Sequence, residues 1–457
     1  MRLEKISLTN FRCFQSLEID LHPRMTILVA DNGGGKTSVL DAIALGFSPL
    51  LRALSSANQR LSGPILGDTD IRLLPNQICA DSANILLAAK LPNESQLKWE
   101  VSQKSSSIAN NENQIAQQQL RNYANAILEH LIHGNNETTL RPDETISRVP
   151  VIAYYGTARG HIDIPVRLKK TRKTEVKEVK YAFATSALYQ SLATIPDFRE
   201  MLRWFDQEEA TELRATRDGL QYINSTLLEE VRNAISLLLQ GHYCCPHFDS
   251  DHKFVIFDQH TRTRLQVAQL SQGYQSMLAL AMDFSRRLCL AGGSNDSEAI
   301  MLIDEVDLHL HPSWQQRIVL DLRRTFPNTQ FILTTHSPEI LTTVRNENIR
   351  ILKQDSEGSW SAQIPETPEV IGVENATAMN DIMEVNAKPE IAETRLYNDY
   401  IVSIENGEHE TAEGMALRQQ LLALYGPMHP LLRDADRLIR FQRLKLKSSA
   451  SQSGRGG

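Results

Sequence analysis

Apolar residues near the start of the chain alternate with polar ones or run together, and each pattern predicts a strand. Residues 5–11 and 17–21 are two short strand-like segments, the second with apolar side chains at alternate positions. Residues 25–29 (MTILV) form an apolar run that leads into a glycine cluster, and a helical pattern follows over residues 37–45. This order predicts a strand, a loop and a helix.

Apolar strands return in the second half of the chain. Residues 299–303 and 330–334 are largely apolar, and a helical pattern over residues 314–324 separates them. Strands without polar alternation are typical of a parallel sheet that is covered on both faces. A strand-like segment at residues 149–155 and helical patterns over residues 184–239 and 389–447 complete the α/β pattern.

Composition limits the class of protein. The 457 residues are 41% hydrophobic and 23% charged, which is usual for a soluble protein, and they contain no apolar run long enough to span a membrane. Five cysteines without framework spacing and the lack of a leader pattern lead us to expect a cytoplasmic protein. Because the net charge is −7, any contact with nucleic acid depends on a local basic patch.

A phosphate-binding loop is the strongest chemical signal. Residues 30–37 (ADNGGGKT) lie between the apolar strand and the helix, as such a loop requires. Glycines let backbone N–H groups approach a phosphate, and the helix N-terminus favours its negative charge. We expect Lys36 to reach the β- and γ-phosphates and the Thr37 hydroxyl to bind Mg²⁺. Ala30 replaces the usual first glycine, which alters the start of the loop without removing a donor.

Two carboxylates end the apolar strand at residues 299–303. Asp304 and Glu305 follow this strand directly. A carboxylate at such a strand end can hold Mg²⁺ through water, and the next one can orient or deprotonate the attacking water. We assign Asp304 to the metal and Glu305 to the water. Alone, the pattern would equally suit a surface strand end, and its pairing with the phosphate loop favours catalysis.

Two further motifs offer groups to a phosphate. Residues 269–276 (QLSQGYQS) precede a helix and could present Ser271 and the Gly273 amide to an anion beside the helix N-terminus. The structural alternative is that Ser271 only caps the helix. His336 follows the last apolar strand, where it could sense a γ-phosphate, although a lone histidine there is usually only hydrogen-bonded or exposed. The order of the four motifs favours one shared nucleotide site.

The four motifs together resemble those of the ABC-type ATPases of the RecF, structural-maintenance-of-chromosomes and overcoming-lysogenization-defect group. Residues 8–14 (LTNFRCF) and 304–312 (DEVDLHLHP) are similar to the last branch in particular. The motif resemblance covers residues 1–75 and 260–355. It implies an α/β fold, a P-loop ABC-ATPase head domain, and Mg²⁺-dependent hydrolysis of ATP.

The resemblance also implies a role for each motif residue. Glu305 and His336 are the expected catalytic residues, and Thr37 and Asp304 are the expected Mg²⁺ ligands. The signature acts in trans in this group, so two protomers would close head-to-tail over two nucleotides. The expected ATP-binding residues are Arg12, Asn32, Gly33, Gly34, Gly35, Lys36, Thr37 and Ser38, the signature is Ser271, Gln272 and Gly273, and the D-loop region contains Asp307 and His309.

Two departures from the group concern its glutamine loop and its nuclease. No clear glutamine loop follows the first lobe, and Gln77 and residues 70–72 are the candidates for it. The overcoming-lysogenization-defect enzymes carry a C-terminal Toprim nuclease, but the late Asp-x-Asp, Asp434 and Asp436, has no apolar strand before it. We therefore expect no nuclease site in this chain.

An ATPase core without a nuclease is similar to the PtuA subunit of the Septu anti-phage system. Three short segments also resemble this subunit but are less specific than the four ATPase motifs; they are residues 154–159, 204–209 and 425–430. This resemblance implies that the chain regulates a separate HNH-type nuclease (PtuB). Related ATPases also occur in retron defence systems, so DNA or retron nucleic acid is a further possible partner. The alternative is an ATP-gated DNA clamp of the RecF type, in DNA repair without a nuclease. The missing glutamine loop and the His-Leu-His-Pro ending at residues 309–312 disfavour a transporter motor.

The motifs also predict the domain organisation. The ATPase lobe would span residues 1–80 and 261–360, with an inserted region at residues 81–260 that is mixed and then mostly helical. A short helical C-terminal extension at residues 361–447 would contact a partner or another copy, and residues 448–457 would form a disordered tail.

Three weaker features remain open between a structural and a functional role. Potential Zn²⁺ ligands gather at His242, Cys244, Cys245, His247 and His252. Adjacent cysteines normally point to opposite sides of a strand, however, and the spacing favours structural residues. The basic run at residues 167–180 could contact a phosphate backbone or be a solvated loop. The basic helix at residues 433–447 could dock a partner or lie at the periphery.

Overall fold

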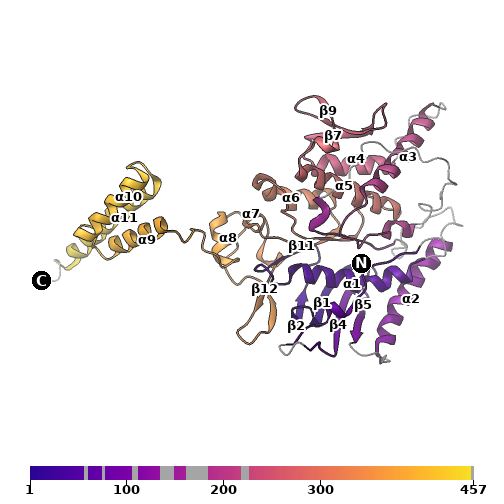
Figure 1. Ribbon diagram of the computed structural model, residues 1–457, viewed down its shortest axis with the longest axis horizontal. Coiled ribbons are helices and arrows are strands. Elements are labelled where there is room, and N and C mark those ends of the chain that lie inside the picture. The colour runs from indigo at the N-terminus through magenta and orange to yellow at the C-terminus, as the bar shows by residue number, and fades with distance from the viewer. Residues whose placement is uncertain are drawn as a thin grey trace. The chain divides into compact units, whose positions relative to one another are not determined.

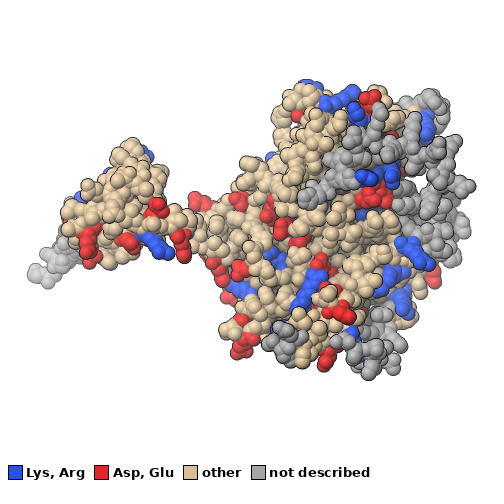
Figure 2. Space-filling view, in the orientation of Figure 1, with Lys and Arg blue, Asp and Glu red and all other residues tan. Residues whose placement is uncertain are grey.

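A computed structural model describes residues 1–55, 60–74, 78–104, 112–133, 149–160, 184–217 and 226–453. The chain divides into two compact units, Met1–Met383 and Glu384–Gly457. Gln77 and the basic run at residues 167–180 lie outside the described residues. Figure 2 shows acidic and basic side chains interspersed over the visible described surface. None of the described helices is long and apolar enough to cross a membrane.

A six-stranded sheet forms the centre of the first unit (Figure 1). Its strands, in spatial order, are β13 (Trp360–Gln363), β12 (Ile349–Gln354), β3 (Met25–Val29), β11 (Thr329–Thr334), β10 (Ala299–Ile303) and β6 (Val151–Tyr155). All neighbours are parallel except the edge pair β12 and β13. Every residue of β3, β10 and β11 is buried, which confirms the apolar strands predicted from the sequence.

A four-stranded antiparallel sheet packs beside this core. It includes strands that the sequence assigned to the insertion at residues 81–260, so those bounds are wrong. Its spatial order is β2 (Phe14–Asp20), β1 (Arg2–Phe11), β4 (Ser82–Lys90) and β5 (Gln96–Lys104). Both β4 and β5, as well as β6 of the core sheet, fall within residues 81–260. Strand β4 belongs with the N-terminal strands because it pairs along β1 and buries Ala83, Ile85, Leu87 and Ala89, and β6 belongs with the core sheet because it pairs with β10.

Helices cover both sides of the six-stranded sheet. Figure 1 shows α1 (Lys36–Ala53) and the antiparallel sheet on one side, and α4 (Thr226–Leu238), α5 (Gln272–Leu290) and α6 (Pro312–Thr325) on the other. The predicted helices at residues 37–45 and 314–324 are thus confirmed. The remaining elements of this unit are α2 (Glu112–His133), α3 (Phe198–Arg217), α7 (Pro338–Leu341), α8 (Asn375–Asp381) and a small sheet of β7 (Tyr243–Phe248), β8 (Phe254–Asp258) and β9 (Thr263–Gln266).

The second unit is a small helical bundle with a core of its own. Its helices are α9 (Ala392–Glu405), α10 (Ala412–Tyr425) and α11 (Pro430–Ser453), which confirm the helical pattern expected over residues 389–447. Tyr400, Ile404 and Leu421 are completely buried in this core. The unit begins later than residue 361, because β13 and α8 belong to the first unit. Helix α11 also extends to Ser453, past residue 448 where a disordered tail was expected.

Candidate ATP-binding site

The phosphate loop connects β3 to α1, and its shape requires its glycines. Gly33 and Gly35 have positive φ angles, +81° and +80°, which glycine adopts without strain. A Cβ at Gly35 would lie 2.3 Å from the Phe14 ring, and one at Gly34 would lie 2.6 Å from the Ala30 Cβ. The loop therefore passes closely over the Ala30 methyl group, and the departure from the usual glycine leaves its fold intact.

Lys36 begins α1 and directs its ammonium back into the loop. Its Nζ donates hydrogen bonds to the carbonyl oxygens of Ala30 (2.7 Å) and Asp31 (3.1 Å), and the residue is only 6% exposed. Burial lowers the pKa of Lys36, while the nearby Asp304 carboxylate opposes that shift. The ammonium is thus a fixed cation inside the loop, where a phosphate group would need it.

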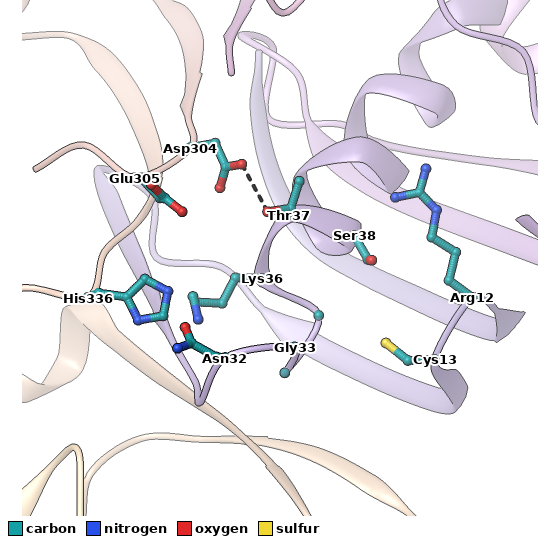
Figure 3. Close-up of a pocket in the computed structure, with 12 residues that line it drawn as sticks. Arg12, Cys13, Asn32, Gly33, Lys36, Thr37, Ser38, Asp304, Glu305 and His336 are labelled. Carbon is teal, nitrogen blue, oxygen red and sulfur yellow. Dashed lines mark hydrogen bonds between the residues drawn. The ribbon is translucent and has the colours of Figure 1, made fainter. Parts of the chain in front are cut away.

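Asp304 joins the end of β10 to the phosphate loop. Its Oδ2 accepts a 2.9 Å hydrogen bond from the Thr37 hydroxyl, which Figure 3 marks with a dashed line. Its Oδ1 accepts a 2.6 Å hydrogen bond from the Thr334 hydroxyl at the end of β11. A carboxylate and a hydroxyl oxygen side by side are ligands of the kind that Mg²⁺ prefers. The donor set of Thr37 and Asp304 therefore fits the expected metal.

Glu305 has a strained backbone that neighbouring groups support. Its φ angle is +48°, a region that non-glycine residues rarely adopt. Its N–H donates to the Thr334 hydroxyl at 2.7 Å, and the Arg159 guanidinium donates to the carbonyl oxygens of Asp304 and Glu305. Arg159 is 1% exposed, and burial lowers its pKa to about 10, which leaves it charged at neutral pH. Arg159 therefore fixes the backbone that carries both carboxylates.

These groups line one pocket of about 350 Å³ (Figure 3). In the close-up, Asp304, Glu305 and His336 face the loop, with His336 beside Lys36, and Arg12 lies on the far side of the loop. Cys13 is an additional lining residue. The structure thus brings together the expected catalytic, metal and nucleotide residues Arg12, Asn32, Gly33, Gly34, Gly35, Lys36, Thr37, Ser38, Asp304, Glu305 and His336.

Arg12 reaches this pocket while two carboxylates hold its guanidinium. It pairs with Asp41 and, at 2.9 Å, with Asp70. Asp41 also accepts a 2.9 Å hydrogen bond from the Tyr154 hydroxyl, and burial raises the pKa of Tyr154. Asp70 belongs to residues 70–72, the candidate for the glutamine loop. This segment therefore lies beside the pocket and contacts it through Arg12.

The signature residues lie outside the pocket of their own chain. Ser271 occupies the N-cap position of α5, but its side chain makes no capping hydrogen bond and is exposed. A Cβ at Gly273 would lie 2.7 Å from the carbonyl oxygen of His309, whose φ angle is +62°. Asp307 accepts a 2.6 Å hydrogen bond from the Thr335 hydroxyl. The signature thus packs against the D-loop region and presents Ser271 to the surface.

The sequence motifs missed several residues that support the site. Arg159 precedes Asp304 by 145 residues, and residues 154–159 carry only a weak family resemblance. The structural reason is that β6 ends at Tyr155 and pairs in parallel with β10, so the ends of both strands meet. Thr334 lies at the end of β11, which also pairs in parallel with β10, so it reaches the same edge of the sheet.

The candidate zinc ligands pair with other groups in the structure. His242 Nδ1 lies 2.7 Å from His260 Nε2, and His247 Nδ1 lies 2.8 Å from the Cys245 carbonyl oxygen. In the part of the chain that the structure describes, no group of three or more His, Cys, Asp or Glu residues is arranged to hold a metal ion.

The late Asp-x-Asp lies on helix α11 and not at a strand end. Asp434 pairs with Arg437 at 3.5 Å, and Asp436 pairs with Arg418 at 2.7 Å. Both carboxylates therefore take part in ion pairs of the small helical unit.

Comparison with known proteins identifies the family. Residues 2–359 match the RecF/RecN/SMC N terminal domain. The chain is 27% identical to the retron Ec83 probable ATPase of Escherichia coli, over 93% of this chain and 84% of the relative. It is 28% identical to the retron Vc95 probable ATPase of Vibrio cholerae serotype O1 biovar El Tor, over 78% and 74%. Identity to the Septu protein PtuA of Bacillus mycoides is 40%, over 20% of this chain and 13% of the relative. Since the family match spans well over half of the sequence, the chain belongs to the RecF/RecN/SMC N-terminal domain family, as its motifs indicated.

Proposed function

We propose that this chain is a Mg²⁺-dependent ATPase that hydrolyses ATP to ADP and phosphate. The observation that carries the proposal is the convergence of the phosphate loop, the Thr37–Asp304 pair, Glu305 and His336 on one pocket. Phosphoryl transfer to water needs donors for the phosphates, oxygen ligands for a metal and a base for the water, and this pocket offers all three. Similarity to two retron probable ATPases supports the same activity.

Each side chain would have a defined task. Lys36 and the loop N–H groups would bind the β- and γ-phosphates. Thr37 and Asp304 would hold Mg²⁺, which neutralises phosphate charge when it is bound. Glu305 would accept a proton from the attacking water, and His336 would sense the γ-phosphate. Glu305 needs a fixed position for this task, because proton transfer depends on hydrogen-bond reach to the water.

A second copy of the chain would complete each ATP site. The signature lies outside the pocket of its own chain, and Ser271 and Gln272 are exposed. We infer that Ser271, Gln272 and Gly273 of one protomer contact the ATP that Lys36 of the other protomer holds. Two nucleotides would then lie between two head-to-tail protomers, and ATP binding would drive the association.

We place this ATPase in the bacterial cytoplasm, in anti-phage defence, as the regulator of a separate HNH-type nuclease. Support comes from the similarity to two retron ATPases over most of the chain and to PtuA over a fifth of it. The unit Glu384–Gly457 has its own core and would contact the nuclease or another copy. DNA or retron nucleic acid would be a further partner.

Co-expression tests this role. The chain is expressed with its neighbouring open reading frames, purified with and without ATP, and the mass and composition of each complex are determined. A co-eluting HNH protein in a defined complex supports the regulator. A Lys36→Ala chain serves as the matched control, because any ATP-dependent difference should disappear with it. A chain that purifies without any nuclease under both conditions contradicts the regulator.

The second candidate function is an ATP-gated DNA clamp without a nuclease partner. Membership of the RecF/RecN/SMC family favours it. The two functions differ in what the isolated dimer retains. Tight, ATP-dependent retention of duplex DNA by the chain alone would favour the clamp, and failure to retain DNA together with a co-eluting nuclease would favour the regulator.

A further inference from the structure

Two adjacent cysteines outside the ATP pocket form a close thiol pair. Cys244 and Cys245 lie on β7, where a bulge shifts the register with β8 between Cys244 and His247. Cys245 has a φ angle of +53°, so the regular alternation of a strand is interrupted there. The two sulfur atoms lie 3.3 Å apart. The bulge thus overturns the expectation that these neighbouring side chains point to opposite sides.

The surroundings leave this pair accessible. The Gln259 amide donates a 2.8 Å hydrogen bond to Cys244 Sγ, and the Cys245 thiol donates to the same sulfur. That donation is the largest cause that raises the pKa of Cys245. Cys245 is exposed and Cys244 is half-buried, whereas Cys289 is buried and its burial raises the pKa to about 12. Small reagents in solution can therefore reach the pair more readily than Cys289.

We propose that Cys244 and Cys245 form a redox-modification site, a dithiol that a hydroperoxide oxidises to a disulfide. The Cys244 sulfur attacks the peroxide, the O–O bond breaks, and the leaving oxygen takes up the thiol proton. The Cys245 sulfur then displaces hydroxide from the sulfenic acid, and the hydroxide leaves as water with the second thiol proton. Two electrons pass from the dithiol to the peroxide. Hydrogen peroxide therefore yields one disulfide and two waters.

The covalent geometry makes this modification reversible. Neighbouring Cα atoms lie about 3.8 Å apart, which is closer than the roughly 4.4–6.8 Å usual for disulfides. A disulfide between adjacent residues is therefore strained, and strained, exposed disulfides are easily reduced by thiols. The modification acts as a transient signal and not as a permanent cross-link.

The pair lies next to an aromatic contact with the signature helix. The Tyr243 ring packs edge-on against Tyr274, with ring centroids 4.7 Å apart, and Tyr274 packs against Trp314 at 4.4 Å. Tyr274 directly follows Gly273 of the signature, and Trp314 lies in the first turn of α6. Closing the disulfide changes the backbone beside Tyr243 and shifts this contact. The resulting effect on ATP turnover rests on the proposed ATPase function.

Mass spectrometry of the full-length chain tests the modification itself. Reduced protein is treated with hydrogen peroxide, denatured, alkylated with iodoacetamide and digested. The peptide with Cys244 and Cys245 should lose two hydrogen atoms and resist alkylation until dithiothreitol is added, while Cys289 should stay alkylated throughout. Full alkylation of Cys244 and Cys245 after peroxide treatment overturns the proposal.

Single variants test the order of the two steps. Cys245→Ser should stop the reaction at a sulfenic acid on Cys244, which dimedone labels. Cys244→Ser should give far less label on Cys245, because the attacking sulfur is gone. Equal dimedone labelling of both variants contradicts the assigned order.

ATP turnover tests the link to the signature. Peroxide-treated wild type should hydrolyse ATP about fivefold more slowly than reduced protein, at the lower end of usual coupling between sites, and dithiothreitol should restore the rate. The Cys244→Ser/Cys245→Ser double variant keeps Cys13 in the ATP pocket and should be insensitive to peroxide. An equal loss in the double variant assigns the effect to another cysteine and overturns the link. If reduced wild type shows no turnover, the proposed function fails, and the mass measurement still decides the dithiol site.

Discussion

The Thr37 hydroxyl donates a 2.9 Å hydrogen bond to Asp304, a residue 267 positions later in the chain. This contact joins the phosphate loop after β3 to the acidic end of β10, with β11 between the two strands. Parallel strands make the contact possible, because their carboxyl ends meet at one edge of the sheet. The candidate ATP site therefore depends on the pairing of two distant parts of the chain.

Removal of Mg²⁺ should stop phosphate release. Asp304→Asn should raise the Mg²⁺ concentration needed for half-maximal turnover on the order of 10–100-fold, because the amide lacks the charge that attracts the ion. Phosphate release is measured while MgCl₂ is titrated. Asp20→Asn, which changes an exposed carboxylate on β2, is the matched control and should leave the midpoint unchanged. An unchanged midpoint in Asp304→Asn would remove Asp304 from the metal site.

Lys36→Ala should abolish detectable ATP binding or weaken it at least about tenfold, because each hydrogen bond to a charged group contributes ~1.5–3 kcal/mol. Calorimetric titration with ATP measures the affinity. Lys98→Ala removes an exposed lysine on β5 and should bind ATP as wild type does. Retained binding in Lys36→Ala would contradict the role of the phosphate loop.

Arg159→Met should lower both turnover and stability. It removes the side-chain donor of the Asp304 carbonyl oxygen, and an unsatisfied buried group costs about 1–3 kcal/mol. The Glu305 carbonyl oxygen loses one of two donors and keeps the Leu308 N–H. Because Arg159 positions Glu305 without lining the pocket, kcat should fall while KM for ATP stays nearly constant. Arg24→Met, at an exposed position, is the control.

The same kinetics decide whether Arg159 is only structural. Arg159→Lys should recover part of the melting temperature and part of kcat, since the ammonium can still donate to a carbonyl oxygen. A loss of melting temperature in Arg159→Met with kcat unchanged would mean that Arg159 supports the fold and has no part in positioning Glu305.

Subunit mixing tests the composite site. A Ser271→Arg chain has an intact phosphate loop and a blocked signature, whereas a Lys36→Ala chain has the reverse. Each should be inactive alone, and an equimolar mixture should recover part of the wild-type phosphate release, because one site of each mixed dimer is intact. Activity of Ser271→Arg alone at the wild-type rate would show that the signature does not act in trans.

The elements that hold the candidate ATP site follow from local patterns in the sequence. The strands at residues 25–29 and 299–303 have the predicted bounds. A continuous apolar run buries all of its side chains when it forms a central strand of a sheet covered on both faces. The phosphate loop and the two carboxylates also occupy predicted positions, since both are short motifs at strand ends.

Features that depend on pairing across the chain could not be predicted in the same way. Strand β4 pairs with β1, and this partner is visible only in three dimensions, so the sequence alone predicts an insertion there. The contact of Arg159 with Glu305 crosses 146 positions and involves backbone oxygens, which leave no mark in the sequence. The close approach of Cys244 and Cys245 likewise depends on a local bulge and a positive φ angle.

The Glu305→Gln variant tests the central claim most directly. The measurement compares ATP binding, phosphate release and dimer formation in this variant and in wild type. The amide keeps the size of the side chain but cannot accept the proton of the attacking water, so turnover should fall about 100-fold or more. ATP binding should persist, and the dimer should stay closed with ATP bound. Phosphate release at the wild-type rate would contradict Glu305 as the base of the proposed ATPase.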